Sequence, residues 1–111
     1  MTARGPPFYE LSFSVKAKVG HGEIVHVCGS CPSLGRWDPS RSLRLETDPK
    51  SYPKWVSVSV AMPLDQTVSY KYCVSSGGEF NRWEDLPEPR TLEEVKSPGA
   101  APATVRDVLD K

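Results

Sequence analysis

Hydrophobic and polar residues alternate along several short stretches of this chain. In 11–19 (LSFSVKAKV) the apolar residues fall on every second position, with serines and lysines between them. After a Gly-His-Gly turn, 23–29 (EIVHVCG) is apolar on both faces, and 68–74 (VSYKYCV) alternates again. A two-residue period is typical of β-strands, and two apolar faces indicate a central strand. The pattern therefore predicts a strand in each stretch, with Lys71 facing away from the two tyrosines of the last one.

The clearest alternation lies in 55–62 (WVSVSVAM), where valines and a methionine alternate with serines, and it predicts one further strand. Brief strands are expected at 43–45, 81–84 and 103–109. Helical turns remain open alternatives at 91–95 and 105–111. The segment 30–42 is dense in Pro, Gly and Ser and predicts a structured loop. No long window has helical periodicity, so the sequence predicts an all-β fold, a small antiparallel β-sandwich or open-sided barrel.

The length of 111 residues fits one domain, expected at 8–111 after a flexible N-terminus at 1–7. No apolar run approaches the roughly 18 residues that span a bilayer, and the N-terminus lacks the apolar region of a signal peptide. We therefore expect an intracellular protein, cytoplasmic or in a plastid, and no membrane partner.

Charge and cysteine content narrow the partners further. Lys and Arg number 14, as do Asp and Glu, so no net field attracts a phosphate backbone, and we expect no nucleic-acid partner. A neutral ligand is more consistent with this charge balance than a charged one. Three cysteines are an odd count and too few for a disulfide framework, which favours a reducing compartment.

Trp37 and Trp83 lie in polar, turn-rich segments, GRWDP and NRWED, with no obvious core face to join. Exposed aromatic side chains can bind the apolar face of a sugar ring. Each is followed by a carboxylate, Asp38 or Glu84, able to accept hydrogen bonds from sugar hydroxyls or to fix the loop. The structural alternative is that both tryptophans cap the open ends of the core.

An ordered set of short motifs resembles the family 20 carbohydrate-binding module, the starch-binding domain, with a good match over 11–90 and a weaker one to Leu109. The motifs are Val27-Cys28-Gly29-Ser30, Leu34-Gly35-Arg36-Trp37-Asp38-Pro39, Pro53-Lys54-Trp55, Tyr70-Lys71-Tyr72, and Trp83-Glu84 followed by Pro87 and Arg90. The resemblance implies a β-sandwich of seven to eight strands, immunoglobulin-like, without catalytic activity, cofactor or metal, that binds α-1,4-glucan.

The resemblance also implies site residues. Trp37 and Trp83 match a bent platform for adjacent glucose rings, and Lys71 and Glu84 match groups that hydrogen-bond the 2- and 3-hydroxyls. The family commonly follows Trp-Glu with a loop ending Pro-Asn-Arg, whose asparagine contacts sugar. Here that loop reads DLPEPR, so the contact is missing or comes from Glu88.

The family's second site is less well preserved. Its counterparts here are His21, Asp48, Tyr52 and Trp55. Trp55 begins an apolar strand, so we expect it to belong partly to the core rather than to a platform.

The function that follows is non-catalytic binding of starch, glycogen or maltooligosaccharides by a monomeric module, tethered at the N-terminus of a larger glucan-active enzyme. A β-sandwich that binds a protein through the same aromatics is the alternative, because such residues also dominate protein interfaces. Redox or zinc chemistry at Cys28-x-x-Cys31 is disfavoured, since Cys28 lies within a strand and further ligands are irregularly spaced. Adjacent carboxylates such as Glu84 and Asp85 point to opposite faces of a strand and cannot flank a substrate.

Overall fold

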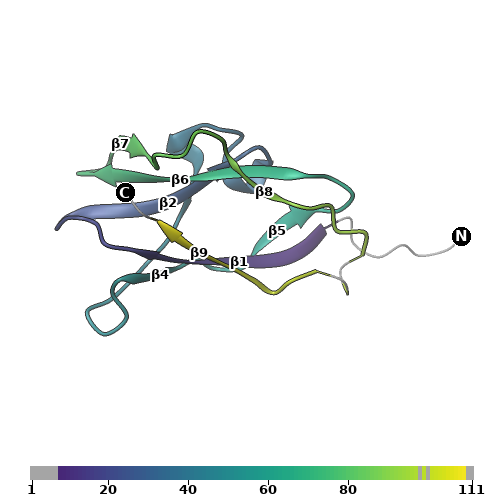
Figure 1. Ribbon diagram of the computed structural model, residues 1–111, viewed down its shortest axis with the longest axis horizontal. Helices are drawn as coiled ribbons and strands as arrows, with labels where there is room; N and C mark the ends of the chain where they lie inside the picture. The colour runs from purple at the N-terminus through teal and green to yellow at the C-terminus, as the bar shows by residue number, and fades with distance from the viewer. Residues whose placement is uncertain (1–7, 98, 100, 110–111) are drawn as a thin grey trace, which may run out of the picture.

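Two β-sheets pack face to face in this protein (Figure 1). The computed structural model describes residues 8–97, 99 and 101–109. The strands are β1 (Phe8–Ala17), β2 (Glu23–Gly29), β3 (Leu43–Arg44), β4 (Lys54–Val56), β5 (Val60–Pro63), β6 (Val68–Ser76), β7 (Glu79–Trp83), β8 (Arg90–Leu92) and β9 (Thr104–Leu109). Two short 3-10 helices, η1 (Pro32–Leu34) and η2 (Pro39–Arg41), lie between β2 and β3. The all-β sandwich expected from the sequence is confirmed.

Sheet I consists of β1, β4, β5 and β9. The long strand β1 pairs antiparallel with β5 along its first half and with β4 along its second half. On its other side β1 pairs with β9 in parallel, with Phe13 opposite Val105. This parallel pair departs from the purely antiparallel sandwich expected from the sequence, because the last strand reaches the sheet through a long connection rather than a hairpin.

Sheet II consists of β2, β3, β6, β7 and β8, with the β2–β6 pair at its centre. Strand β6 is long enough to pair with β8 through its first residues and with β7 through its last ones. The register of β6 and β7 shifts between Val74 and Ser75, which marks a β-bulge. The bulge determines which side chains of β7 project from the outer face of sheet II.

The core lies between the sheets and is made by the residues that alternation assigns to their inner faces. Leu11, Phe13 and Val15 of β1 are fully or almost fully buried, as are Val25, Val27 and Tyr72 of sheet II. Phe13 meets Tyr70 edge to face, with ring centroids 5.4 Å apart. Each such side chain contributes about 1.5–3 kcal/mol by leaving water, so these strands stabilise the whole sandwich.

The stretch 55–62 forms two strands rather than one. Between β4 and β5 the backbone is irregular, and the Ser57 hydroxyl accepts a hydrogen bond from the Phe13 backbone N–H at 2.8 Å. The irregularity reverses the alternation, so Val56 and Val58 face solvent while Met62 is buried. Residues 90–92 form strand β8 instead of the helical turn considered at 91–95. The described chain therefore has nine strands, where seven to eight were expected.

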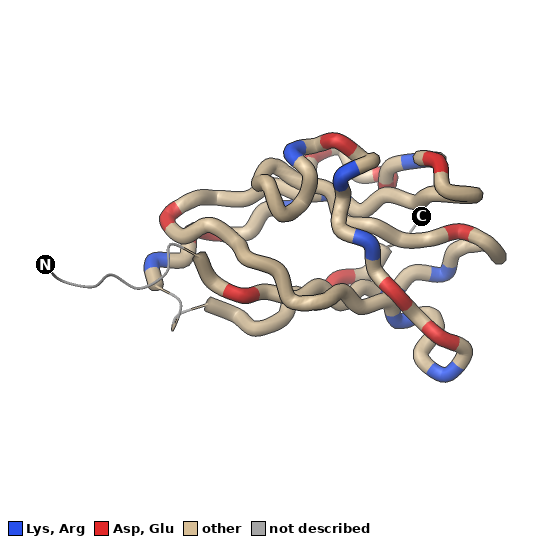
Figure 2. Tube along the Cα trace, turned by 180° about the vertical axis from the view of Figure 1, so that it is seen from behind, with Lys and Arg blue, Asp and Glu red and all other residues tan. Residues whose placement is uncertain are grey.

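Basic and acidic residues are interspersed over both sheets (Figure 2), in keeping with the equal numbers of the two charges. None of the described residues belongs to a helix of the length and hydropathy that crossing a bilayer requires. The expected flexible segment 1–7 lies outside the described residues.

Candidate functional site

The outer face of sheet II carries side chains from neighbouring strands in rows. Trp83 of β7 lies opposite Cys73 of β6, and Cys73 lies opposite His26 of β2. Lys71 lies two residues before Cys73, so it projects from the same face in the next row. The sequence expectation that Lys71 faces away from Tyr70 and Tyr72 is confirmed, because both tyrosines are buried in the core.

The loop between β2 and β3 brings Trp37 to this face. Gly35, Arg36 and Trp37 have φ angles of 85°, 50° and 67°, so three consecutive residues adopt the left-handed conformation. That conformation costs about 1–2 kcal/mol for each residue with a side chain. The Trp37 backbone N–H donates to the Gly29 carbonyl at 2.8 Å, which fixes the strained turn on the end of β2. Strain of this kind is concentrated at functional sites.

Trp37 and Trp83 lie together on the surface. Their ring centroids are 6.1 Å apart and their planes are inclined at 60°. Trp37 is 38% exposed and Trp83 is half-buried, so both reach solvent. Segments far apart in the sequence thus form a bent aromatic surface, the arrangement that the family resemblance implies at Trp37 and Trp83.

Lys71 lies beside this pair and is half-buried. Its Nζ donates a hydrogen bond to the Leu86 carbonyl at 2.9 Å, which ties the loop after β7 to sheet II. An ammonium group has three N–H donors, so this bond leaves donors for a ligand hydroxyl. The geometry fits both a structural and a binding role for Lys71.

Glu84 does not face the site. Because successive residues of a strand point to opposite faces, Trp83 points outward and Glu84 points inward. Its side chain is 2% exposed. The carboxylate accepts hydrogen bonds from the Tyr72 backbone N–H at 3.0 Å and from the Arg90 guanidinium at 2.9 and 3.1 Å. The expected contact of its carboxylate with sugar hydroxyls is therefore corrected: Glu84 anchors the strand that carries Trp83.

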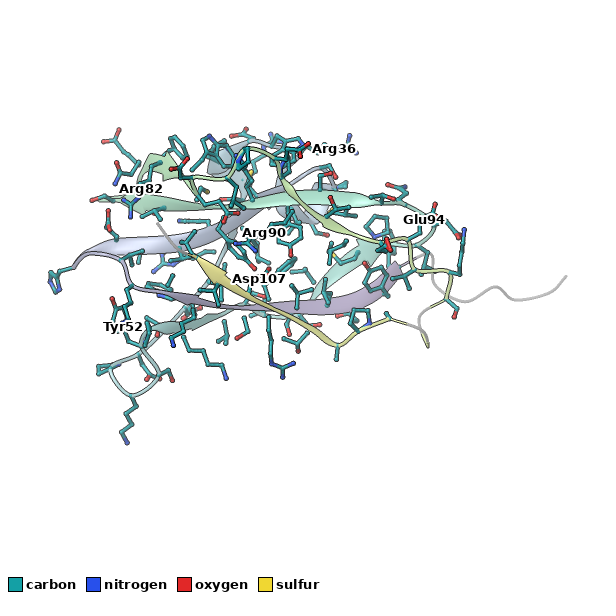
Figure 3. The ribbon with its side chains drawn as sticks, in the orientation of Figure 1. Arg36, Tyr52, Arg82, Arg90, Glu94 and Asp107 are labelled. Atoms are coloured by element: carbon teal, nitrogen blue, oxygen red, sulfur yellow. The ribbon has the colours of Figure 1, made fainter. Side chains whose placement is uncertain are left out.

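Arg90 continues this polar cluster between the sheets, where Figure 3 shows it beside Asp107 of β9. Its guanidinium lies 3.5 Å from the Asp107 carboxylate and 5.4 Å from the centre of the Tyr72 ring. The Tyr70 and Tyr72 hydroxyls donate to the same carboxylate at 2.8 and 2.7 Å. Burial, with the nearby negative charge, raises the pKa of both tyrosines, so they remain neutral donors.

The remaining first-site candidates lie in loops. Glu88 is exposed in the loop between β7 and β8. The Lys71 side chain donates its hydrogen bond to the backbone of this same loop, at Leu86. Asp38 follows Trp37 and caps η2, since its carboxylate accepts hydrogen bonds from the backbone N–H and the hydroxyl of Ser40. These bonds lower the pKa of Asp38. Its carboxylate thus stabilises the loop that presents the tryptophan.

The second-site candidates lie at the opposite side of the molecule, around the loop that projects from sheet I (Figure 1). Trp55 is 5% exposed and its indole N–H donates to the Ala17 carbonyl at 3.1 Å, so it belongs to the core. Tyr52 is 44% exposed and its hydroxyl donates to the Val19 carbonyl at 3.0 Å (Figure 3). His21 is exposed in the turn after Val19.

Asp48 organises the projecting loop rather than presenting a free carboxylate. One of its oxygens accepts the backbone N–H groups of Lys50 and Ser51 at 2.9 and 2.8 Å, which lowers its pKa. The structure therefore leaves Tyr52 as an exposed aromatic side chain of this group and places Trp55 inside. It does not assemble an aromatic pair comparable to that on sheet II.

The three cysteines, Cys28, Cys31 and Cys73, are buried, and none of them forms a disulfide bond in the part of the chain that the structure describes. Burial raises the pKa of Cys28 to about 11 and that of Cys73 to about 12, so both are protonated and poorly nucleophilic at neutral pH. Within residues 8–97, 99 and 101–109, no group of three or more His, Cys, Asp or Glu side chains is placed to hold a metal ion.

Sequence reasoning missed Phe80. Phe80 and Trp83 are three residues apart, a spacing that puts side chains on opposite faces of a regular strand. The β-bulge makes Phe80 pair with Ser75 while Trp83 pairs with Cys73, so both project from the outer face. Their ring centroids are 5.4 Å apart. No local pattern reveals this, because the bulge is a property of the β6–β7 pairing.

Known proteins share sequence and fold with this chain. The sequence profile of the family described as the starch binding domain matches residues 9–99. Glucoamylase-1 of Schizophyllum commune is 34% identical over 77 residues, which are 69% of this chain and 13% of that protein. The α-amylase of Thermomonospora curvata is 40% identical over 60 residues, 54% of this chain and 10% of that protein. The chain thus spans only a small part of these relatives.

Solved structures share the fold. The family 20 carbohydrate-binding module of the maltotetraose-forming amylase from Pseudomonas saccharophila has a TM-score of 0.67 at 24% identity, covering 90% of this chain and 99% of that chain. The glucoamylase of Hypocrea jecorina has a TM-score of 0.81 at 21% identity and covers 100% of this chain and 18% of that chain. At such identities the likeness concerns the fold.

Proposed function

This chain belongs to the starch binding domain family, and we propose that it binds α-1,4-glucan on the outer face of sheet II through Trp37 and Trp83. The domain is a non-catalytic glucan-binding module, like those that form part of larger glucoamylases and amylases. The observation that carries the site assignment is the exposed, inclined tryptophan pair, joined by Lys71 in the neighbouring row.

Stacking on the tryptophans supplies most of the binding free energy, and polar groups orient the sugar. An aromatic contact contributes about 0.5–1.5 kcal/mol beyond its buried area, and the cost of ordering the ligand opposes it, so affinity is on the order of micromolar to millimolar. Such sites are effective on a polymer, whose repeated units and tethered partner domain raise the effective concentration. The module therefore serves to hold a larger glucan-active protein on its polymer.

We propose that the module is monomeric, forms part of a larger enzyme, and acts on starch or glycogen inside the cell, in the cytoplasm or a plastid. Free thiols at Cys28, Cys31 and Cys73 support a reducing compartment. Glu88, Tyr52 and His21 are exposed and remain candidates for further sugar contacts.

Sedimentation with granular starch tests the site assignment. Trp37→Ala and Trp83→Ala each remove one ring of the platform, and we expect both to reduce the bound fraction of the purified domain at least tenfold. Lys71→Ala should weaken binding less, because it removes one hydrogen-bonding group.

Phe8→Ala is the matched control, since Phe8 is a similarly exposed aromatic residue on sheet I. Each variant is checked by its near-UV circular dichroism. If the folded tryptophan variants still sediment with starch like the wild type, the site lies elsewhere.

A further inference from the structure

A hollow of about 360 Å3 opens on the outer face of sheet II next to the tryptophan pair. Strands β2, β3, β6 and β7 and the loop after Trp37 enclose it. Its walls are formed by Ile24, His26, Pro39, Ser40, Arg44, Cys73, Val74, Ser75, Gly78 and Phe80. A volume near 300 Å3 is at the lower end of the range for small-molecule sites.

Phe80 belongs both to the hollow and to the aromatic surface. It is 47% exposed, and its ring lies 5.4 Å from that of Trp83 with the planes inclined at 57°. Trp83 in turn lies 6.1 Å from Trp37 at an inclination of 60°. The three rings therefore form a continuous row from the β2–β3 loop to the edge of the hollow.

The composition of the hollow suits a neutral sugar ring. Phe80 and Pro39 offer apolar surface for the C–H face of the ring. The Arg44 guanidinium can donate to sugar hydroxyls, and the Ser40 oxygen, whose proton is donated to Asp38, can accept from them. The Arg44 backbone pairs with that of β2, but its guanidinium forms no hydrogen bond or ion pair with another described residue, so its N–H donors are available. None of the described residues that line the hollow carries a carboxylate.

We propose that the glucan site continues past Trp83, with a third glucose ring on Phe80 and its hydroxyls bound by Arg44 and Ser40 in the hollow. This inference rests on the proposed function, because it takes the tryptophan pair as the binding site for two rings. It makes the domain selective for chain segments of three or more α-1,4-linked units. A disaccharide occupies only the tryptophans.

The test compares maltose with maltoheptaose by NMR titration of the domain and of three variants. Phe80→Ala should weaken the affinity for maltoheptaose about three- to tenfold, the usual effect of one aromatic contact, and leave that for maltose within twofold. Arg44→Gln should also weaken the affinity for maltoheptaose more than that for maltose, and it leaves the aromatic rings at Phe80 and Trp83 unchanged. Arg41→Gln is the matched control, since Arg41 is exposed nearby but does not line the hollow.

The outcomes separate the two claims. If neither sugar binds the wild type, the proposed function fails. If both sugars bind but Phe80→Ala weakens them equally, Phe80 acts only by supporting Trp83, and the third subsite is wrong. If Phe80→Ala and Arg44→Gln leave maltoheptaose affinity unchanged, the hollow is not part of the glucan site.

Discussion

At the scale of residues, Trp83 and Glu84 show how one strand serves two purposes. Trp83 points to solvent and forms the platform, while the carboxylate of Glu84 accepts hydrogen bonds from Arg90 and Tyr72 in the interior. The charged group is tolerated there because a guanidinium and a backbone N–H satisfy it. The side chain that anchors the strand is thus adjacent to the one that we propose as a ligand contact.

Glu84→Gln separates anchoring from sugar contact. It removes one of the two carboxylates beside the partly buried Arg90 guanidinium and leaves Asp107, 3.5 Å away, as the remaining negative charge. Removing one partner of a buried ion pair usually costs about 3–5 kcal/mol. Since the Arg90 side chain is 22% exposed and can turn to water, we expect the free energy of unfolding to fall by about 2–3 kcal/mol in urea denaturation.

Glu88→Gln, at an exposed position, should leave stability unchanged within about 0.5 kcal/mol. If Glu84→Gln instead keeps full stability and loses glucan binding, Glu84 contacts sugar directly.

At the scale of elements, the β2–β3 loop is the part whose geometry the site requires most. Gly35 has φ +85°, and a Cβ there would lie 2.7 Å from the backbone of Arg41. The loop can close over sheet II and turn Trp37 outward only with glycine at this point. Gly22 has nearly the same φ, +84°, but no atom lies within 4 Å of its ideal Cβ position.

These two glycines form a matched pair for mutagenesis. Gly22→Ala should cost about 1 kcal/mol, the strain of a left-handed alanine. Gly35→Ala should cost about 3 kcal/mol, because the backbone clash is added, and should weaken glucan affinity as Trp37 moves. Thermal unfolding and calorimetric binding measure both effects. Equal losses of stability in the two variants would contradict the close packing of this loop.

The sequence predicts those elements that depend on local pattern. Two-residue alternation locates β1, β2 and β6 and assigns their core faces, and the two tryptophans are visible as aromatic residues in polar segments. It does not predict the break at 57–59, the parallel pairing of β9 or the bulge that exposes Phe80. Those features arise from contacts between segments far apart in the chain, on which local alternation carries no information.

At the scale of the whole molecule, the two sheets have different outer surfaces. Sheet II carries the tryptophans, the β2–β3 loop and the hollow, whereas Asp48 and Tyr52 belong to the loop before β4 of sheet I. That loop projects from the sandwich (Figure 1). Basic and acidic residues are equal in number, and a glucan is uncharged. Recognition therefore depends on shape and stacking rather than on a long-range field.

Acid should destabilise the folded domain first through His26. Burial and the charge of Arg44 lower its pKa below the usual 6.5, and its buried Nδ1 has no hydrogen-bond partner among the described residues. The other groups at its ring are Cys73, protonated at neutral pH, and the Ser75 hydroxyl, 2.8 Å from Nε2. The unfolded chain therefore binds a proton at His26 more readily than the folded one. Above about pH 6.5 neither state is protonated there, so His26 does not lower the free energy of unfolding; as the pH falls below this value, proton binding to the unfolded chain lowers it.

Urea midpoints measured between pH 8 and pH 5 check this expectation. The wild type should be constant down to about pH 6.5 and then lose stability, while His26→Gln should be flatter across that interval. A wild-type stability that rises as pH falls from 6.5 to 5 would contradict the assigned environment of His26. Losses below about pH 4 belong to carboxylates with lowered pKa, such as Glu23 and Asp48.

The most direct test of the central claim is calorimetric titration of the domain with β-cyclodextrin, an α-1,4-linked ring, with cellopentaose as the β-linked control. We expect saturable micromolar to millimolar binding of β-cyclodextrin alone, with no heat from cellopentaose. The Trp37→Ala Trp83→Ala double variant, shown to be folded by its unfolding transition, should give no saturation. Equal binding of both sugars, or unchanged binding by the folded double variant, would contradict a glucan site on the tryptophan pair.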